Sequence, residues 1–476
     1  MMRPMLVLAV LLPASCSLSD LEHQPCRSAV SCREVFGARS TCGAEGFCTD
    51  LETPARCEET YPVDLLAQPD IEEWLLLGSA FDVGTSEGAG RERSVEVAVR
   101  IVNEAGGVDG RRVGLVKCNS ERDPERFPES DVPPLNEMSD YFVNLGIQVI
   151  VGGDASTSPR ELASLVLDQG IVFVTPEPGD PWLDTLDSNE GTEQNPGRLW
   201  STVPSVQHQG FAIAKVLEES LEPPSQVTII ADATDYGASV KDQFSKRFVG
   251  APPTEFTVDV AETENLRNVI KTVAASGAEV VIYAGERRVA QFLELAAEQP
   301  DFEAKALVLT EAGAHSEVLN DKVVGRDRLY PMTQGVRSAI AEPSRNPYVR
   351  FQQAYENTFG VPIVEDLGFA ASYDAAWLAM SALAYAASQG GDRAGDAIAI
   401  GLRQLSAGER FETVAPDWPL AQARLLQGQS IDLVGASGEL DFDTSEQLEP
   451  RVEAWDIEEQ PSNDPRFRVR VLGVVL

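Results

Sequence analysis

Histidine is scarce in this 476-residue chain, which contains three copies of it. His208 and His315 have no cysteine or nucleophile–acid pattern around them, and His23 lies near the N-terminus, outside the main body. The sequence also lacks a G-x-S-x-G turn, an H-E-x-x-H pair and a phosphate-cradling lysine loop. These absences disfavour an enzyme, and we expect neither a cofactor nor a metal site.

Basic and aromatic residues are also few. Lys and Arg number 38 against 75 Asp and Glu, which gives a formal net charge of −37. Such a charge repels nucleic acid and anionic membrane surfaces, so we expect neither as a partner. Aromatic residues make up 7% of the chain, and the abundance of Ala, Val, Ile and Leu favours the α/β class. The acidic segment 180–193 lacks the ligand spacing of a calcium loop, and we interpret it as a solvated loop.

Long apolar runs are missing beyond the N-terminus. Residues 5–12 are apolar, and the small residues Ala14 and Ser15 precede Cys16. This start resembles a bacterial lipoprotein signal, in which the peptide 1–15 is removed and Cys16 is lipidated. No later run is long enough to cross a bilayer. We therefore predict an exported protein that faces the periplasm or the cell exterior and contacts the membrane only through an N-terminal lipid.

Cysteine is rare but strongly patterned. After Cys16 the sequence has six cysteines, of which five lie within 26–57. That stretch is too short to fold on a hydrophobic core, and an even cysteine count in an exported chain favours disulfides, whereas the lack of C-x-x-C spacing disfavours zinc. We predict a cysteine-rich module and linker over 16–60, closed by two bridges, with a third bridge from Cys57 or a neighbour to Cys118. The candidate cysteines are Cys26, Cys32, Cys42, Cys48, Cys57 and Cys118.

The clearest local pattern lies between two short apolar runs. The β-branched run 149–151 suits a strand that is buried on both faces. Ser158 and Pro159 are typical of a helix start, and a second buried strand follows at 171–174. In such a unit the loop after the first strand faces the ligand side of the sheet. The loop 154–158 is therefore a candidate binding site, although an ordinary capped helix without a ligand would have the same pattern.

The same alternation of strand and helix runs through most of the chain. Apolar runs that suit buried strands alternate with segments whose apolar residues recur at helical spacing, which is typical of parallel sheets covered by helices. A loop at 79–90 separates the first strand from the first helix. The predicted strands are 74–78, 113–117, 149–151, 171–174, 226–231, 256–260, 279–283 and 306–310. Because the pattern occurs in two successive sets, we predict an α/β fold with two doubly wound parallel-sheet lobes.

Five stretches resemble, in the same order, those of type I periplasmic solute-binding proteins. They are AVRIVNEAGGVDGRRVGLVKCN at 98–119, VIVGGDASTS with IVFVTP within 149–176, LWSTVPSVQHQGFAIAKVL at 199–217, DLGFAASYDAAWLAMSAL at 366–383 and GASGELDFD at 435–443. This family includes the leucine/isoleucine/valine-binding proteins of ABC importers. The resemblance covers the chain from about Glu73 to the C-terminus and leaves the cysteine-rich module outside it.

The resemblance implies two lobes that are joined by three crossovers and close on a ligand. The implied parts are lobe 1, 72–203 and 333–428, and lobe 2, 204–332 and 429–476. The crossings would lie near 202–205, 330–333 and 427–433. A ligand held between the lobes favours the closed state, because it makes additional contacts there.

The resemblance also implies where a ligand binds. In relatives that bind amino acids, the loop at 155–158 contacts the ligand carboxylate, Tyr236 matches an aromatic residue that covers the ligand, and Glu311 matches an acid that binds its ammonium group. Glu177 stands where the family has small residues and a Thr, which departs from the usual α-amino-acid clamp. The predicted ligand-binding residues are Asp154, Ser156, Thr157, Glu177, Tyr236 and Glu311.

Three of these predicted ligand-binding residues are acidic, and no Arg or Lys occurs in their loops before Arg160. Carboxylates without a counter-charge repel one another in a closing cleft and resist desolvation. A cation or an amine would relieve both effects, so we predict a positively charged or amine-bearing ligand. The alternative is that the acidic side chains turn outward to water.

The sequence thus predicts extracytoplasmic binding of a small polar ligand, of the amino acid, amide or amine type, for delivery to an ABC permease. Two alternatives remain open. The first is a ligand-sensing lipoprotein that reports to a signalling partner. The second is a cell-surface interaction protein with a vestigial cleft, in which the cysteine-rich module makes the contacts. For a binding protein, we expect that module to contribute little to ligand affinity.

Overall fold

The computed structural model describes most of the chain after its first 23 residues. The described residues are 24–121, 133–153, 159–178, 186, 192, 196–219, 224–259, 262–285, 288–314, 318–319, 325–339, 345–363, 367–390, 394–442, 451–461 and 466–476. The predicted signal peptide, Cys16 and nearly all of the acidic segment 180–193 lie outside them. Within the described part of the chain, no helix is both long enough and apolar enough to cross a bilayer.

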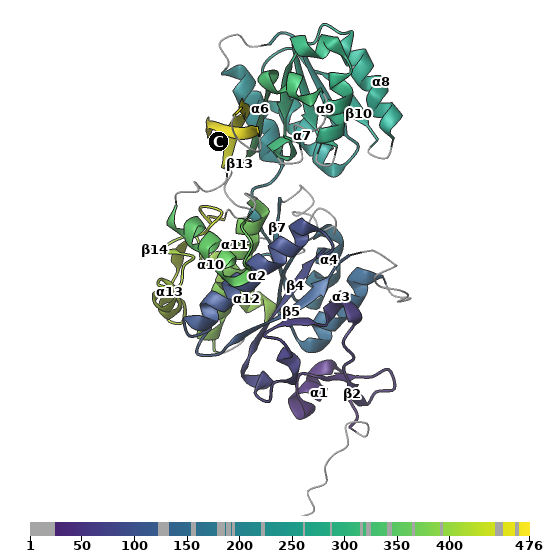
Figure 1. The fold of residues 1–476 in the computed structure, drawn as a ribbon. Coiled ribbons are helices and arrows are strands. Elements are labelled where there is room, and N and C mark those ends of the chain that lie inside the picture. Colours follow the sequence, from purple (N-terminus) through teal and green to yellow (C-terminus); the bar gives the residue numbers. More distant parts are fainter. Residues whose placement is uncertain are drawn as a thin grey trace, which may run out of the picture.

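Two lobes lie one above the other, and a small module is attached to the lower lobe (Figure 1). We call the lobe with the six-stranded sheet lobe 1 and the lobe with the seven-stranded sheet lobe 2. In Figure 1 lobe 2 is at the top, and the purple module is at the end of lobe 1 that points away from lobe 2. The predicted α/β fold with two doubly wound lobes and a disulfide-rich module is confirmed.

Lobe 1 is built on a mostly parallel sheet with the strand order β3-β5-β4-β6-β7-β8. Its strands are β3 (Glu59–Tyr61), β4 (Leu75–Phe81), β5 (Val113–Asn119), β6 (Val149–Gly152), β7 (Val172–Pro178) and β8 (Leu199–Val203). Its helices are α2 (Ser86–Glu104), α3 (Pro134–Leu145), α4 (Pro159–Val166), α10 (Asn346–Phe359), α11 (Leu367–Ser388), α12 (Gly395–Arg403) and α13 (Trp418–Leu425). A small parallel pair, β14 (Glu409–Glu412) and β15 (Ile431–Val434), completes the lobe.

The centre of lobe 1 is the contact between α2 and α11. Residues 368–386 of α11 are all buried, as expected for a helix that is apolar on every side. Most of them are alanines or other small residues, which allow neighbouring helices to approach closely. A Cβ atom at Gly90 of α2 would overlap the ring of Phe369, so this contact requires glycine.

Lobe 2 has the strand order β10-β9-β11-β12-β13-β16-β17, in which β9 to β13 are parallel and the last two strands are antiparallel to their neighbours. Its strands are β9 (Val227–Asp232), β10 (Thr254–Val258), β11 (Val280–Ala284), β12 (Ala306–Leu309), β13 (Thr333–Ser338), β16 (Val452–Glu459) and β17 (Phe467–Val474). Its helices are α6 (Gln207–Glu218), α7 (Asp235–Arg247), α8 (Thr263–Ala274) and α9 (Val289–Ala297).

Two of the three predicted crossings between the lobes lie at other positions in the structure. The first crossing, between β8 and α6, lies close to its predicted place at 202–205. The second follows β13 and the third follows β15, because β13 joins the sheet of lobe 2 and β15 packs in the core of lobe 1. The crossings expected near 330–333 and 427–433, and the boundaries at 333 and 429, are therefore displaced along the chain. An apolar run reveals that a strand is buried but not which sheet it joins.

Helix α11 binds the chain at the first crossing and in the turn that follows β15. Thr202, at the first crossing, donates its hydroxyl to the carbonyl of Ala371 at 3.0 Å. Asp374 accepts the N–H groups of Ala436 at 2.8 Å and Ser437 at 2.6 Å, in the turn that follows β15. Burial raises the pKa of Asp374 to about 6, although these hydrogen bonds oppose the shift. One buried helix thus binds the chain at the first crossing and in the turn that precedes the third.

Three disulfides organise the module as predicted. Cys26–Cys42 and Cys32–Cys48 close a unit made of α1 (Ala29–Phe36), β1 (Ser40–Cys42) and β2 (Cys48–Asp50), and Cys57–Cys118 joins the module to β5. The sulfur atoms of three of these cysteines lie within 4.8 Å of one another. Because all three are oxidised in disulfides, they do not offer the thiolates that a metal would need.

Candidate functional site

The carboxyl ends of the parallel strands in each sheet point toward the other lobe. In lobe 1, β8 ends at Val203 and the chain enters α6 of lobe 2 at Gln207. In lobe 2, β13 ends at Ser338 and the chain then returns to lobe 1. Ligands of open α/β sheets bind outside these carboxyl ends. We call the loops that follow β4 to β7 in lobe 1 and β9 to β12 in lobe 2 the interlobe face.

One ion pair connects the two lobes directly across this face. Arg160 Nη1, at the start of α4, lies 3.2 Å from Asp235 Oδ2, at the start of α7. The two side chains are 51% and 71% exposed, so water screens the pair and it contributes little to stability. The pair shows that the first turns of α4 and α7 are neighbours.

On lobe 1, Glu177 lies at the carboxyl end of β7 and forms an ion pair with Arg91 of α2. Glu177 is 9% exposed and Arg91 is 6% exposed. Arg91 also contacts Glu87 Oε1 at 2.5 Å, one helical turn earlier. A buried carboxylate needs such a counter-charge. The expectation that Glu177 has no compensating charge is therefore wrong, because Arg91 supplies one from another element.

The predicted loop at 79–90 is too long, because the helix that carries Arg91 begins within it. In the structure α2 begins at Ser86, and the Thr85 hydroxyl caps it by accepting the N–H of Gly88 at 3.0 Å. The sequence does contain the signal. A Thr is a favourable N-cap, and an acid followed four residues later by an Arg, as at 87 and 91, is typical of a helix.

On lobe 2, Tyr236 and Glu311 come together through Gln209 of α6. Gln209 Oε1 accepts the Tyr236 hydroxyl at 3.2 Å and the Glu311 N–H at 3.1 Å. Glu311 Oε2 in turn accepts the hydroxyl of Ser338 at 3.2 Å. Gln209 is 1% exposed and Tyr236 is 6% exposed, so the arrangement is largely buried. Sequence reasoning did not select Gln209, although it lies within one of the stretches that carry the family resemblance.

A further buried acid lies on the same side. Asp232, at the carboxyl end of β9, is 2% exposed and accepts the hydroxyl of Tyr283 at 2.7 Å. Burial, together with the charge of Asp232, raises the pKa of Tyr283, so this tyrosine stays protonated and continues to donate. With Asp235 and Glu311, lobe 2 brings three carboxylates to the interlobe face.

The remaining predicted ligand-binding residues are Asp154, Ser156 and Thr157, which lie outside the described residues. Their described neighbours in sequence are Gly153, directly after β6, and Pro159, the first residue of α4. Their part in ligand binding stays a prediction.

Comparison with known proteins identifies the family. A family model described as periplasmic binding protein matches residues 82–419. The chain belongs to the periplasmic binding protein family. The match includes most of lobe 1 and lobe 2 up to β13, and leaves the cysteine-rich module and the C-terminal strands β15, β16 and β17 outside it.

This periplasmic binding protein aligns with only part of the length of its curated relatives. The Leu/Ile/Val-binding protein of Citrobacter freundii is 25% identical over 212 residues, which is 44% of this chain and 52% of the relative. The Leu/Ile/Val-binding protein of Escherichia coli K12 is 27% identical over 160 residues, which is 34% of this chain and 38% of the relative. The matched part of the chain thus spans about half of the length of such relatives, or less.

Solved structures agree in fold. The substrate-binding protein of a branched-chain amino acid transporter from Streptococcus pneumoniae, in complex with isoleucine, has a TM-score of 0.59 and 14% identity, over 84% of this chain and 99% of that one. A solute-binding protein of an ABC transporter from R. palustris, in complex with benzoate, has a TM-score of 0.58 and 14% identity, over 84% and 96%. At this identity the likeness establishes the fold alone.

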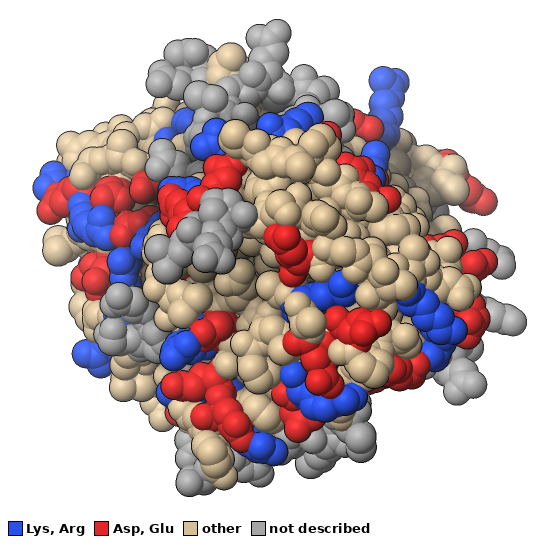
Figure 2. Space-filling view, turned by 90° about the horizontal axis from the view of Figure 1, so that it is seen from above, with Lys and Arg blue, Asp and Glu red and all other residues tan. Residues whose placement is uncertain are grey.

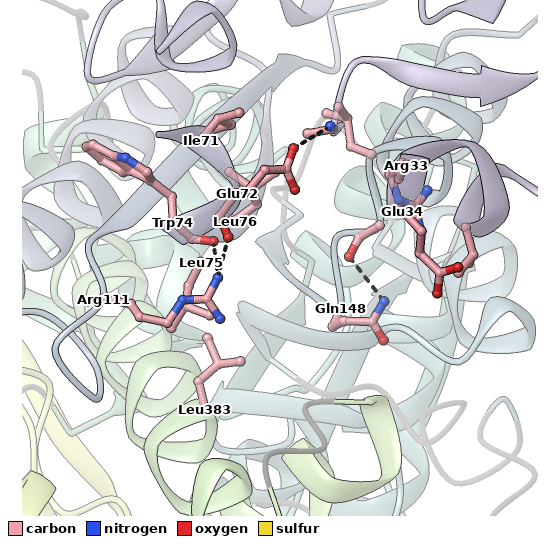
Figure 3. Close-up of a pocket in the computed structure, with 14 residues that line it drawn as sticks. Arg33, Glu34, Ile71, Glu72, Trp74, Leu75, Leu76, Arg111, Gln148 and Leu383 are labelled. Carbon is pink, nitrogen blue, oxygen red and sulfur yellow. Dashed lines mark hydrogen bonds between the residues drawn. The ribbon is translucent and has the colours of Figure 1, made fainter. Parts of the chain in front are cut away.

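A groove of about 420 Å³ lies elsewhere on this periplasmic binding protein, between the module and lobe 1 (Figure 3). Its lining comes from α1 and from the amino ends of the lobe 1 strands, opposite the interlobe face. Glu72 Oε1 accepts the N–H of Ala38 at 2.8 Å, and Arg111 donates to the carbonyls of Glu72 and Trp74, as Figure 3 shows. These polar groups bind the protein itself, so we attribute the groove to the packing of the module on lobe 1.

Proposed function

We propose that this protein binds a small polar ligand between its lobes and delivers it to an ABC importer. The observation that carries the proposal is that the carboxyl ends of the parallel strands in the two sheets face each other. On lobe 2, hydrogen bonds link Tyr236, Gln209 and Glu311. On lobe 1, Arg91 pairs with Glu177. Crossings that leave from these edges suit closure around a ligand. The relatives named for binding leucine, isoleucine and valine, and the structures with isoleucine or benzoate, support a ligand of that size.

The ligand in this proposal is of the amino acid, amide or amine type, with its cationic group directed to lobe 2. Asp232 already accepts the Tyr283 hydroxyl and Asp235 already pairs with Arg160, so Glu311 is the proposed contact of the cationic group, whose charge a carboxylate attracts. On lobe 1, Arg91 already offsets Glu177. That side therefore offers hydrogen bonds to the polar end of the ligand, with Ser156 and Thr157 as the proposed donors and acceptors. The role is binding and not catalysis.

A thermal-shift panel of L-leucine, L-glutamine, agmatine and benzoate tests the proposal. Ligand binding to the folded state raises the unfolding temperature by mass action, equivalent to about 2.7 kcal/mol at a concentration of 100 Kd. We expect at least one amine-bearing compound to do so. Stabilisation by benzoate alone, or by none of the four, would contradict the proposed ligand type.

Glu311→Gln then tests the assigned cationic contact. The variant keeps the size of the side chain but removes its charge, so affinity for the amine-bearing compound should fall by about tenfold or more. Glu264→Gln is the matched control, because Glu264 lies on the exposed face of α8 in the same lobe, with its side chain 78% exposed. Equal affinities of wild type and Glu311→Gln would contradict the assignment of Glu311 as the contact of the cationic group.

Uptake measurements separate import from sensing. Cells that lack this protein should lose uptake of the labelled compound that stabilises it. Unchanged uptake together with a lost transcriptional response to the compound would favour the sensor.

A further inference from the structure

The last residues of the cysteine-rich module reach the interlobe face. Cys57 is bonded to Cys118, the second-last residue of β5, and β5 runs parallel to β4. The carboxyl end of β5 therefore lies at the same edge as the ends of β4 and β7. Other parts of the module pack at the opposite end of lobe 1, where Arg33 donates to the carbonyl of Asn144 near the end of α3. The module thus extends along lobe 1 from the end that points away from lobe 2, which we call the base of lobe 1, to the interlobe face.

Arg56, next to Cys57, binds the loop that follows β5. Its Nη1 donates to the carbonyl of Asn119 at 2.8 Å and to that of Glu121 at 3.3 Å, and its Nε lies 2.8 Å from Glu137 Oε2. Arg56 is 6% exposed. A planar guanidinium with several fixed bonds holds its acceptors in one geometry. One module side chain therefore fixes two backbone carbonyls of this loop.

Asn119 extends this contact to the loop after β4. Its Oδ1 accepts the N–H of Val83 at 3.3 Å and the N–H of Glu121 at 3.0 Å. Ser120 N donates to the carbonyl of Phe81 at 2.9 Å. The described residues that follow β4 and β5 are therefore held together, and Arg56 supports them from the module side.

The loop after β4 leads directly into α2. Thr85 caps α2, and Arg91 of α2 pairs with Glu177 at the end of β7. We propose that Arg56 and the Cys57–Cys118 bridge position the lobe 1 side of the interlobe face. The module, which its cysteine pattern alone predicts to contribute little to binding, then takes part in ordering the site. The consequence for ligand affinity rests on the proposed function, whereas the consequence for loop order does not.

Amide hydrogen exchange of the ligand-free full chain tests the positioning. Arg56→Ala should speed exchange at Val83, Ser120 and Glu121 by about tenfold, because these amides or their acceptors lose a fixed position. Arg33→Ala is the matched control: it removes a module arginine that also binds backbone carbonyls, but at the base of lobe 1, so these amides should be unchanged. Arg56→Lys keeps the positive charge and should restore part of the protection. Equal exchange at these amides in Arg56→Ala and Arg33→Ala would overturn the proposal.

Titration with L-leucine, the ligand of a solved relative from Desulfitobacterium hafniense, adds the functional arm. Arg56→Ala should weaken binding by about tenfold, because loops that were preorganised must now be ordered on binding. Arg33→Ala should stay close to wild type. If wild type binds L-leucine and the Arg56→Ala and Arg33→Ala variants bind it equally well, the proposed role of Arg56 in positioning the site is wrong. If wild type does not bind L-leucine, the proposed ligand type loses support, and hydrogen exchange alone decides the positioning.

Discussion

At the scale of single residues, the Arg91–Glu177 pair is the buried contact with the clearest energetic consequence. Arg91→Met would leave Glu177 buried without its counter-charge, and we expect the free energy of unfolding to fall by about 3 kcal/mol. Urea denaturation at neutral pH measures the change. Lys246→Met is a suitable control, since Lys246 and Asp242 form a pair whose side chains are 64% and 54% exposed. Its effect should be below about 0.5 kcal/mol, and equal losses in both variants would contradict the argument.

Glu92 of α2 predicts a pH dependence. It is 6% exposed and lies 3.6 Å from Lys117 Nζ; burial raises its pKa to about 7, although attraction to Lys117 opposes the shift. In the unfolded chain the group titrates near its ordinary value of 4.5. Between these values the folded state binds the proton more tightly, so the contribution of Glu92 to stability falls as pH rises through this window.

Glu92→Gln removes this titration. Stability of the variant, measured by urea denaturation at several pH values across the window, should therefore decline less steeply with rising pH than that of wild type. Glu264→Gln on the exposed face of α8 should leave the slope unchanged. Parallel curves for wild type and Glu92→Gln would show that Glu92 does not titrate as its burial predicts.

At the scale of elements, the three disulfides should differ in what they stabilise. Cys57–Cys118 closes a separation of 61 residues and crosses from the module to β5, whereas Cys26–Cys42 closes 16 residues within the module. Loop-closure entropy predicts that loss of the longer bridge lowers stability by about 4 kcal/mol. Protection of the β5 amides should consequently fall in Cys57→Ser/Cys118→Ser.

Cys26→Ser/Cys42→Ser is the control for that experiment. Its bridge lies within the module, so the β5 amides should keep nearly their full protection. A similar loss of protection in both double variants would mean that the module stabilises lobe 1 as one block, irrespective of which bridge is removed.

At the scale of the whole molecule, the net charge of −37 is an excess of acidic over basic residues, of which the chain has many of both. Figure 2, seen from the lobe 2 end, shows acidic and basic side chains beside one another on that face. Along and just before β17, partly exposed arginines pair with acids of β16: Arg466–Glu459, Arg468–Glu458 and Arg470–Asp456. Such solvated pairs contribute little to stability, and the excess of acid mainly favours solubility.

The same charge bears on membrane attachment. An acidic body is repelled by anionic lipid, so we propose that a lipid on Cys16 is the only anchor. Cys16→Ser should move the protein from the membrane to the soluble fraction of fractionated cells. Cys26→Ser/Cys42→Ser, which alters cysteines without touching the anchor, should remain with the membrane. Membrane association of the Cys16→Ser variant would refute the assignment.

The local elements and their class follow from residue type and spacing. Runs such as 149–151 and 171–174 correspond to β6 and β7, because burial on both faces leaves an uninterrupted apolar run that can be recognised within a few residues. The cysteine count and its clustering likewise predicted two bridges within the module and one from Cys57 or a neighbour to Cys118, and the structure has Cys57 as that partner. Each of these inferences depends on residue type and spacing over a short stretch, or on the scarcity of alternative partners.

Which distant residues meet depends on how the elements pack in three dimensions. Arg91 and Glu177 are 86 positions apart, and Gln209 and Glu311 are 102 apart, so their contacts depend on how helices pack on sheets and not on any local pattern. The same holds for the later crossings and for Arg56, whose role follows from where β5 ends. Strand order, and with it the neighbours of each buried charge, emerges from packing of whole elements, because local periodicity specifies the face that is buried but not the element that covers it.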